Sequence, residues 1–294
     1  MTGSTEGYAV DAFGERGSLR RLALPALGSR DVLVRVEAAG VNPIDFKLRE
    51  GLDPSRALPL VLGQDFAGTV EAAGAGAAEL SGRRIFGIAH SGAFAREIVV
   101  SADGIVAEVP GGVEAAAAAA LPTPGLTALA LVERVAHHGA RSVAVIGPDG
   151  AVGRLVLQIA AAHGIKTLRL RSDDEPAAAL ANAGLEGVDA AIDTAGDKAY
   201  LESLAPLVRA GGYAVSIVFV ADVEWFAARG IEAENLNAGT TPFFSGDGLR
   251  ALADLVARKQ VAPHVGAVRP FAEALDVLDG VKARTLRGKI VLAL

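Results

Sequence analysis

A strand-like run that leads into a glycine-rich turn is the part of the sequence whose residue types and spacing best suit chemistry. Residues 142–146 are rich in valine and isoleucine and predict a buried strand. Gly147 and Gly150 then predict a turn, since glycine adopts bends that other residues avoid. Residues 152–163 continue with helical spacing, and Gly164 ends the helix. A strand, turn and helix of this kind bind the pyrophosphate of a dinucleotide through the free N–H groups of the first helical turn.

The glycines of this turn have separate predicted roles, because glycine has no Cβ. Gly150 lets the backbone approach a pyrophosphate, and Gly153 lets the helix pack closely on the strand. The residues predicted to bind the cofactor at the turn are Gly147, Gly150, Ala151, Val152 and Gly153.

The turn departs from the usual G-x-G-x-x-G pattern at two positions. Pro148 stands where the pattern has its middle glycine, and Asp149 adds a negative charge beside the predicted phosphates. The alternative interpretation is therefore an ordinary strand, turn and helix of a parallel sheet with no ligand.

The strand expected after this helix carries the residues that would distinguish NADP from NAD. Residues 166–170 predict that strand, and Arg171 and Ser172 follow where an NAD-binding chain tends to carry an acid for the ribose 2′-hydroxyl. A guanidinium and a hydroxyl favour a 2′-phosphate, because charge-assisted hydrogen bonds to phosphate are strong. NADPH is the predicted cofactor. NADH stays open, because Asp173 and Asp174 follow directly and the arginine side chains could lie on a solvated strand end.

Composition limits the classes of function. The chain has 294 residues, enough for two domains, and 51% of them are hydrophobic. The net charge of −6 is spread without blocks, which argues against nucleic acid and membrane partners and favours a small molecule. Cysteine is absent, so disulfides, thiol nucleophiles and cysteine-bound metals are excluded. No apolar run opens the chain or reaches the about 18 residues that span a bilayer, so a cytoplasmic location is expected.

The elements that must position these residues form two groups along the chain. Short strand-like runs at residues 31–37, 68–71 and 95–100, separated by glycine and proline, predict a β-rich domain. From Val113 onward helices and strands alternate, which predicts a doubly wound α/β domain. Its further elements, with the closing strand, are expected at residues 115–120, 127–136, 188–193, 200–209, 212–220, 248–259 and 288–294.

Six separate motifs occur in the order and at about the spacing of one known family. They are Gly40-Val-Asn-Pro-Ile-Asp45, Pro59-Leu-Val-Leu-Gly-Gln-Asp-Phe-Ala-Gly-Thr-Val70, Ala118-Ala-Ala-Leu-Pro122 with Gly125-Leu-Thr-Ala128, the glycine turn, Ile192-Asp-Thr-Ala-Gly196 and Arg287-Gly-Lys-Ile-Val-Leu292. Through them the chain resembles the zinc-free quinone oxidoreductase branch of the medium-chain dehydrogenase/reductase superfamily.

This resemblance implies a fold and a division into domains. The implied fold is α/β, with a GroES-like β-rich catalytic domain at residues 1–122 and 264–294 and a Rossmann doubly wound parallel-sheet domain at residues 123–263. It also implies an active site in the cleft between the two domains. A homodimer is expected through the edge strand of the Rossmann sheet.

The same resemblance bears on metal binding. Zinc-containing relatives have a cysteine where this chain has Asn42 and a histidine where it has Gln64, and their structural zinc needs four cysteines. Neither amide residue is a usual zinc ligand, so no metal is predicted.

Without a metal, hydrogen bonds must polarise the acceptor while hydride moves from the cofactor. By resemblance, Asn42 and Thr127 are the predicted catalytic residues, and Asp45 is expected to fix the backbone around Asn42. The alternatives are that Asn42 holds the turn before Pro43 and that Thr127 caps a helix.

Aromatic residues and one histidine complete the predicted site. Phe219 and Phe243 are expected beside the cofactor, and Phe46, His90 and Phe244 at the substrate pocket. Ordinary core packing is the alternative for each phenylalanine. His90 is the candidate proton donor. Solvent is the other source of the proton, because the tyrosines that relatives place near the substrate are missing.

Three hypotheses about function follow. The first is a zinc-independent, NADPH-dependent reductase of quinones or activated enones that works by direct hydride transfer. The second is an enoyl-thioester reductase, for which Lys47, Arg49 and Arg56 would form a basic rim for the phosphates of the thioester carrier. The third is a nucleotide-binding or structural protein without turnover, suggested by Pro148 and Asp149.

Overall fold

The chain divides into two compact units, each with its own core. The computed structural model describes residues 3–90 and 92–294. Unit 1 comprises residues up to 123 together with residues 245–257 and 263–294, and unit 2 comprises residues 124–244 and 258–262. The predicted catalytic-domain segments, residues 1–122 and 264–294, fall in unit 1. Residues 245–257, expected in the second domain, group with unit 1, where helix α8 (Gly246–Ala257) packs on strand β8 (Val106–Glu108).

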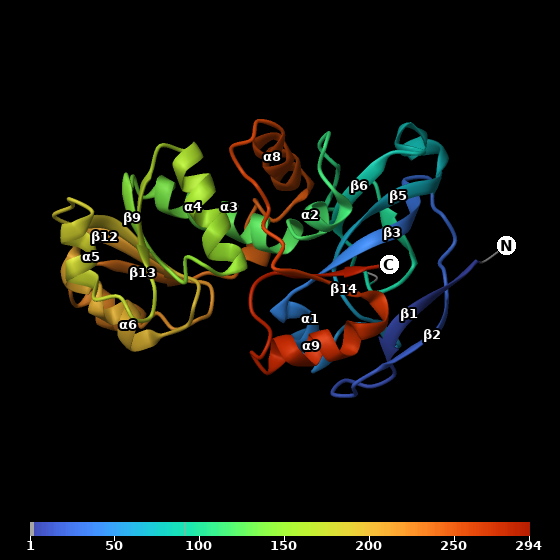
Figure 1. Ribbon diagram of the computed structural model, residues 1–294, viewed down its shortest axis with the longest axis horizontal. Coiled ribbons are helices and arrows are strands. Elements are labelled where there is room, and N and C mark those ends of the chain that lie inside the picture. The colour runs from blue at the N-terminus through green and yellow to red at the C-terminus, as the bar shows by residue number, and fades with distance from the viewer. Residues whose placement is uncertain (1–2, 91) are drawn as a thin grey trace. The chain divides into compact units, whose positions relative to one another are not determined.

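Unit 1 is built around a mixed sheet of seven strands (Figure 1). Its order is β14-β15-β3-β5-β6-β8, with β7 also paired to β3, and a smaller sheet has the order β2-β1-β4. The strands are β1 (Ser4–Val10), β2 (Ser18–Ala23), β3 (Asp31–Val41), β4 (Leu60–Val61), β5 (Asp65–Ala73), β6 (Arg84–Ile88), β7 (Glu97–Ser101), β8, β14 (Ala267–Pro270) and β15 (Ile290–Ala293). The helices are α1 (Pro43–Arg49), α2 (Ala115–Ala119), α8 and α9 (Ala274–Lys282), with 3-10 turns η1 (Ala75–Leu80) and η4 (Phe271–Glu273).

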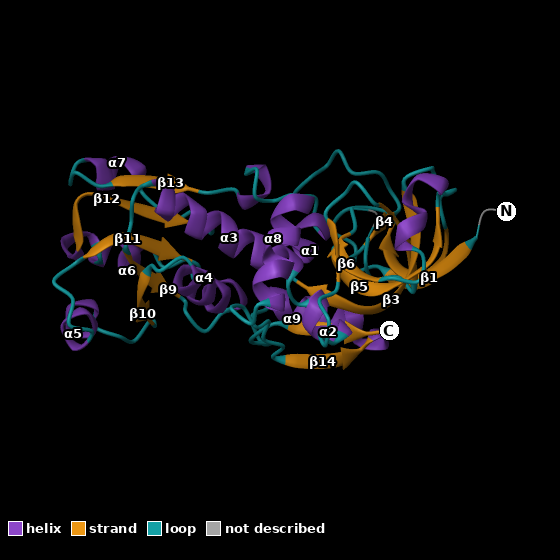
Figure 2. Cartoon of the chain, turned by 90° about the horizontal axis from the view of Figure 1, so that it is seen from above, coloured by secondary structure: helices purple, strands orange, loops and turns teal. Residues whose placement is uncertain are grey.

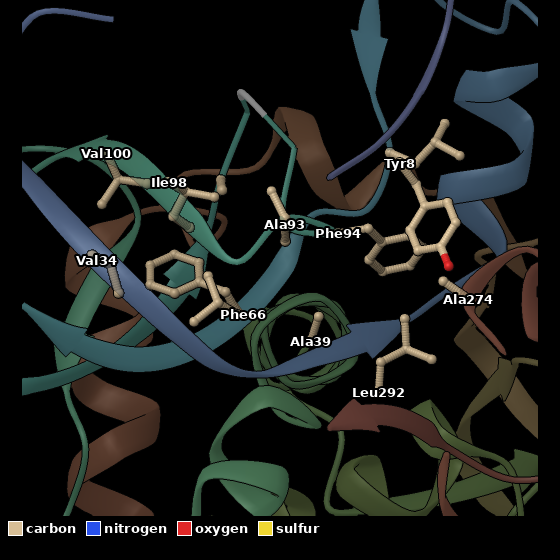
Figure 3. Packing of buried hydrophobic residues seen from close by; sticks show 14 of the residues in the cluster. Tyr8, Val34, Ala39, Phe66, Ala93, Phe94, Ile98, Val100, Ala274 and Leu292 are labelled. Carbon is tan, nitrogen blue, oxygen red and sulfur yellow. The ribbon is translucent and has the colours of Figure 1, made fainter. Parts of the chain in front are cut away.

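Burial of aromatic and branched side chains on both sides of β3 stabilises unit 1. Phe66 and Phe94 are fully buried, and Tyr8 packs edge to face on Phe271 at a centroid distance of 5.0 Å. Figure 3 shows these core side chains gathered around β3. Strand β15 brings the end of the chain into the same sheet by pairing antiparallel with β3, with Val291 opposite Gly40.

Unit 2 is a parallel sheet with flanking helices (Figure 2). Its strand order is β10-β9-β11-β12-β13, and every pairing in it is parallel. The strands are β9 (Ser142–Ile146), β10 (Lys166–Leu170), β11 (Val188–Asp193), β12 (Val208–Ser216) and β13 (Glu232–Asn235). The helices are α3 (Pro122–His137), α4 (Ala151–Ala162), α5 (Pro176–Asn182), α6 (Lys198–Ser203) and α7 (Val223–Ala227), with η2 (Ala205–Leu207) and η3 (Ala238–Thr240).

The strand order places a switch point at β9. The chain passes from β9 to β10 on one side, and β11 then pairs with β9 on the other side. In parallel sheets, ligands bind beyond the carboxyl ends of the strands at such a reversal. The glycine turn follows β9 directly, so it lies at the switch point.

The doubly wound α/β prediction is confirmed, and strands β9, β10 and β11 have the predicted bounds. Three element predictions are wrong. The helix predicted at residues 200–209 ends at Ser203, and strand β12 begins at Val208 and not at residue 212. Strand β12 ends at Ser216 and not at residue 220, because the chain bends at Phe219, whose φ is 65°. The second helical run begins at Pro122 and not at Thr127, because proline suits the first turn of a helix.

Within the part of the chain that the structure describes, no helix combines the length and apolar character needed to cross a bilayer.

Gly153 and Gly150 make a matched pair for testing how closely α4 packs on the turn. A Cβ on Gly153 would lie 2.1 Å from the Gly147 carbonyl oxygen, whereas a Cβ on Gly150 would have its nearest neighbour at 3.4 Å. We expect Gly153→Ala to lower the free energy of unfolding by about 1 to 3 kcal/mol, because backbone must move. Gly150→Ala should stay within about 0.5 kcal/mol. Urea unfolding of both variants measures the contrast, and equal losses would contradict the close approach.

Candidate functional site

The glycine turn after β9 exposes the start of helix α4. Gly147 has a φ of 78°, in the left-handed region, and its N–H donates to the Leu170 carbonyl at 3.2 Å. Gly150 stands at the N-cap of α4 and has no side chain with which to cap the helix. The first N–H groups of a helix have no partner within it. Ala151, Val152 and Gly153, all predicted to bind the cofactor, therefore begin a helix that suits an anion.

A buried network ties the carboxyl ends of three strands together beside this turn. Asp193, at the end of β11, is fully buried, and its carboxylate accepts the N–H groups of Ala195 and Gly196 and the hydroxyl of Ser216. Thr194 Oγ1 donates to the Ile146 carbonyl at 2.8 Å. The motif containing Asp193 was noted in the sequence, but its role was missed. These hydrogen bonds link the carboxyl ends of β9, β11 and β12, where the glycine turn begins.

Phe219 lies in a strained loop at the same edge of the sheet. Its φ of 65° is rare for a residue with a side chain, and the residue is 60% exposed. Ser216 Oγ holds the loop by accepting the N–H groups of Val218 and Val220 at 3.2 and 3.3 Å. Such strain is concentrated at functional sites. The exposure of Phe219 argues against core packing, and its contact with the cofactor stays a prediction.

Arg171 lies next to the turn through an ion pair with Asp149. Arg171 Nε donates to Asp149 Oδ2 at 2.7 Å, and Arg169 Nη2 donates to Oδ1 at 3.2 Å. The hydrogen bond from Arg171 holds the pKa of Asp149 below its usual value. Ser172 is exposed beside them. The structure thus brings Arg171 to the glycine turn, as predicted, but with a carboxylate already bound to it.

Asn42 is buried and makes hydrogen bonds through both its backbone and its side chain. It is 4% exposed and caps α1, and its backbone N–H donates to Asp45 Oδ2 at 2.7 Å, which confirms the expected role of Asp45. Its side-chain oxygen accepts from Lys289 Nζ at 2.6 Å, and its Nδ2 donates to Asp65 Oδ2 at 2.8 Å. A cation on the oxygen and an anion on the nitrogen fix the orientation of the amide.

Lys289 and Asp65, which hold Asn42, form a buried ion pair that the sequence analysis missed. They are 3% and 0% exposed, and Lys289 Nζ lies 3.3 Å from Asp65 Oδ2. Lys289 also donates to the Val41 carbonyl at 3.3 Å, and Thr123 donates to Asp65 through its N–H and its hydroxyl. Both charged residues lie in motifs that carry the family resemblance. Their place in these motifs is the one feature of the sequence that could have indicated the ion pair.

Asp45 is a second buried carboxyl group in this cluster. Burial, with a further contribution from the charge of Asp65, raises the pKa of Asp45 to about 8. Its Oδ1 is buried and has no hydrogen-bond partner within the described residues. Asp45 is therefore largely protonated at neutral pH.

The other predicted residues of the substrate pocket are placed less favourably. Phe46 is half-buried and packs against the core of unit 1. His90 is exposed at a turn, and partial desolvation, helped by the charge of Arg56, lowers the pKa of its imidazole. Phe244 is half-buried in unit 2. Thr127 is buried inside α3, so the helix-cap alternative for it is wrong.

Arg49 cannot serve in the basic rim suggested for a thioester carrier. Its side chain is buried, and Nη2 donates to Asp279 Oδ1 at 2.8 Å. Arg56 instead donates to the His90 carbonyl at 3.1 Å, and Lys47 is exposed. The basic rim is thus reduced to two of its three members.

Phe243 lines a cavity of about 660 Å³ in unit 2. The cavity lies between α3 and the segment that follows β13, with Arg134 paired to Glu234 at 3.1 Å in its wall. None of its lining residues belongs to the glycine turn. Of the residues predicted to bind the cofactor, Phe243 alone lines this cavity.

The donor atoms of the predicted site do not suit zinc. Asn42 Oδ1 already receives a hydrogen bond from the Lys289 ammonium, and a metal cation on the same oxygen would be repelled. Among residues 3–90 and 92–294, no group of three or more histidine, cysteine, aspartate or glutamate side chains is arranged to hold a metal ion.

Comparison with known proteins agrees with this architecture. Residues 28–111 match the family of alcohol dehydrogenase GroES-like domains, and residues 164–292 match the zinc-binding dehydrogenase family. The solved structure of mycobacterial Rv1454c complexed with NADPH has a TM-score of 0.79 and 26% identity, and the match covers 99% of this chain and all of that one.

Two curated relatives share part of the sequence. The zinc-type alcohol dehydrogenase-like protein C337.11 of Schizosaccharomyces pombe is 32% identical over 66% of this chain and 63% of its own length. The quinone oxidoreductase of Rattus norvegicus is 37% identical over 52% of this chain and 48% of its own length. The chain thus spans less than two thirds of either relative.

These matches, with the GroES-like unit and the parallel-sheet unit, define the class. The chain belongs to the medium-chain dehydrogenase/reductase superfamily. Within that superfamily it is similar to quinone oxidoreductases, among them the rat relative and a 26% identical mycobacterial structure.

Removal of Lys289 tests the energetic weight of the buried pair. Lys289→Met leaves Asp65 buried without its cation, so we expect the free energy of unfolding to fall by about 3 to 5 kcal/mol. The double variant with Asp65→Asn should recover part of the loss. Lys198→Met is the control, since the exposed pair of Lys198 with Asp222 should contribute little to the free energy of unfolding. Urea unfolding measures all of them, and equal losses for the two lysines would contradict a special role for Lys289.

The raised pKa of Asp45 predicts how stability depends on pH. The folded protein holds the Asp45 proton up to about pH 8, whereas the unfolded chain releases it near pH 3.8. The folded state binds more protons between these values, so stability falls as pH rises, by at most about 1.4 kcal/mol per unit. Asp45→Asn should remove this slope and be relatively more stable at alkaline pH. Unfolding curves from pH 4 to 9 measure it, and parallel profiles would refute the assignment.

Proposed function

We propose that the chain is a zinc-independent, NADPH-dependent reductase of quinones or activated enones that acts by direct hydride transfer. The observation that carries the proposal is the close approach of Gly153 to the Gly147 carbonyl at the switch point of a parallel sheet, which leaves the start of α4 facing outward from the sheet edge. The NADPH complex of a 26% identical structure supports it.

The residues of unit 2 fit a dinucleotide. Ala151, Val152 and Gly153 would hold the pyrophosphate with their N–H groups, and Arg171 with Ser172 would hold the 2′-phosphate. Phe219 and Phe243 would flank the cofactor. When bound, NADPH supplies a hydride from C4 of its nicotinamide ring. Thr127 is proposed to hydrogen-bond near that ring.

Asn42 is proposed to polarise the acceptor carbonyl. One N–H of its amide is bound to Asp65, and the amide nitrogen carries a second N–H. Because Lys289 binds the amide oxygen, the group is polarised and its remaining N–H becomes a better donor. Lys289 and Asp65 act through Asn42 as positioning residues.

The proton of the reduced product is proposed to come from water. Hydride transfer to a quinone gives a hydroquinone anion that solvent can protonate. The pKa of His90 is lowered by partial burial and by the charge of Arg56, which favours its neutral imidazole and argues against His90 as the proton donor. His90 and Phe244, with Phe46, remain proposed contacts of the substrate pocket.

The relatives favour a quinone or enone over an enoyl thioester. The rat relative is named a quinone oxidoreductase. The thioester alternative is weakened because Arg49 is bound to Asp279. Zinc independence rests on the occupied amide oxygen of Asn42. The homodimer and the cytoplasmic location stay predictions.

Cofactor titration and turnover test this proposal together. We expect NADPH to bind more tightly than NADH and to be oxidised by benzoquinone or by an enone such as methyl vinyl ketone. Arg171→Ala should weaken NADPH by about 1 to 3 kcal/mol and leave NADH nearly unchanged. Gly150→Ala should fold normally yet weaken both cofactors, because its Cβ would crowd the pyrophosphate.

Fluorescence of the bound nicotinamide and loss of absorbance on oxidation are the measurements. Crotonyl thioesters in place of quinones separate the second hypothesis. Binding without oxidation across all acceptors would favour the protein without turnover, and no binding at all would defeat the nucleotide assignment.

A further inference from the structure

Beside the glycine turn, the Asp149 carboxylate is surrounded by three arginines, an arrangement that cofactor binding alone does not require. The Asp149 carboxylate accepts from Arg171 Nε at 2.7 Å and from Arg169 Nη2 at 3.2 Å. A third guanidinium, that of Arg154, lies 3.9 Å from Asp149 Oδ1 and donates through Nε to the Asp149 backbone carbonyl at 2.9 Å. A single carboxylate thus pairs with one cation in β10, one directly after β10 and one in α4.

These side chains are exposed enough to exchange partners. Arg169 and Arg171 are each 51% exposed, and Asp149 is 44% exposed. Ion pairs at this exposure are weak, so an incoming anion of higher charge can replace the carboxylate. A phosphate is such an anion, because it carries nearly two charges and accepts hydrogen bonds from the same guanidinium fork.

The other acidic residues here are bound differently. Asp174 Oδ2 accepts the backbone N–H of Arg171 at 2.7 Å, so it fixes the chain after β10, and it acts on the guanidinium through its charge without a hydrogen bond to it among the described contacts. Asp173 contributes charge near Arg171 without a bond to its guanidinium among the described contacts. Asp149 is therefore the carboxylate that shares donor atoms with a phosphate.

We propose that Asp149 competes with the 2′-phosphate of the cofactor for Arg169 and Arg171. By occupying these arginines it lowers the preference of the site for NADPH over NADH. This inference rests on the proposed NADPH-dependent function and concerns the selectivity of the same site. When Asp149 holds the arginines, the phosphate must displace it and then lie beside its negative charge. NADH, which lacks the phosphate, meets no such competition.

The test compares a phosphorylated and an unphosphorylated fragment of the cofactor, so it does not depend on turnover. Calorimetric titration with 2′,5′-ADP and with 5′-AMP gives the two affinities. For Asp149→Asn we expect 2′,5′-ADP to bind about three- to tenfold more tightly, and 5′-AMP to change by less than about twofold. The gain should shrink as sodium chloride is raised, because both groups are exposed.

Two further variants act as controls. Asp174→Asn removes a nearby negative charge but leaves the guanidinium partners in place, so its effect on 2′,5′-ADP should be smaller than that of Asp149→Asn. In the double variant with Arg171→Ala, Asp149→Asn should bring little gain, because the freed donor is gone. Unchanged or weaker binding of 2′,5′-ADP by Asp149→Asn would overturn the inference, since the carboxylate would then orient the arginines for the ligand.

The outcomes also separate this inference from the proposed function. NADPH oxidation by the unmodified protein without any gain in Asp149→Asn would defeat the inference and leave the reductase assignment standing. A gain for 2′,5′-ADP without oxidation of NADPH by any acceptor would do the reverse. If neither protein binds either nucleotide, both are wrong.

Discussion

The buried ion pair between Lys289 and Asp65 is the interaction on which unit 1 and its proposed active-site amide depend. Two charges at 3% and 0% exposure are tolerated because every strong donor of the ammonium reaches oxygen: Asn42 Oδ1, Asp65 Oδ2 and the Val41 carbonyl. The pair joins the last strand of the chain to the middle of the sheet. A hydrophobic pair could fill this space, but it could not fix the direction of the Asn42 amide.

In unit 2, the position of helix α4 depends on the absence of a Cβ at Gly153. Gly153 packs where a Cβ would lie 2.1 Å from the Gly147 oxygen, so helix α4 approaches the turn as closely as backbone permits. Thr194 then donates to the Ile146 carbonyl at the end of β9, and Asp193 accepts from the Ser216 hydroxyl at the end of β12. At this edge of the sheet, the loop at Phe219 has a strained φ of 65°, and a bound ligand would gain from its exposed aromatic ring.

The sequence predicted what depends on local periodicity and missed what depends on distant contacts. Strands β9 and β11 were predicted with their observed bounds because they are short apolar runs that end near glycines, and β10 because it directly follows the end of helix α4 at Gly164. The end of β12 was not, since residues 217–220 are also apolar and the bend depends on the hydroxyl of Ser216. The partnership of Asn42 with Lys289 spans 247 positions, and no local pattern encodes it. Asp149 was read as a charge that repels phosphate, and only the structure shows the arginines that neutralise it.

The buried pair of Lys289 and Asp65 and the exposed cluster around Asp149 differ in how easily their ion pairs exchange partners, because they differ in exposure to solvent. Inside unit 1 the low dielectric makes each partner costly to leave unpaired, so the arrangement is permanent and its loss weakens the fold. At the edge of unit 2, water screens the Asp149 cluster, and its bonds can be exchanged for those of a ligand at small cost. Substitutions in the exposed Asp149 cluster can therefore change the selectivity for phosphate, while the buried pair of Lys289 and Asp65 keeps Asn42 in place. Stability and selectivity are controlled by different residues.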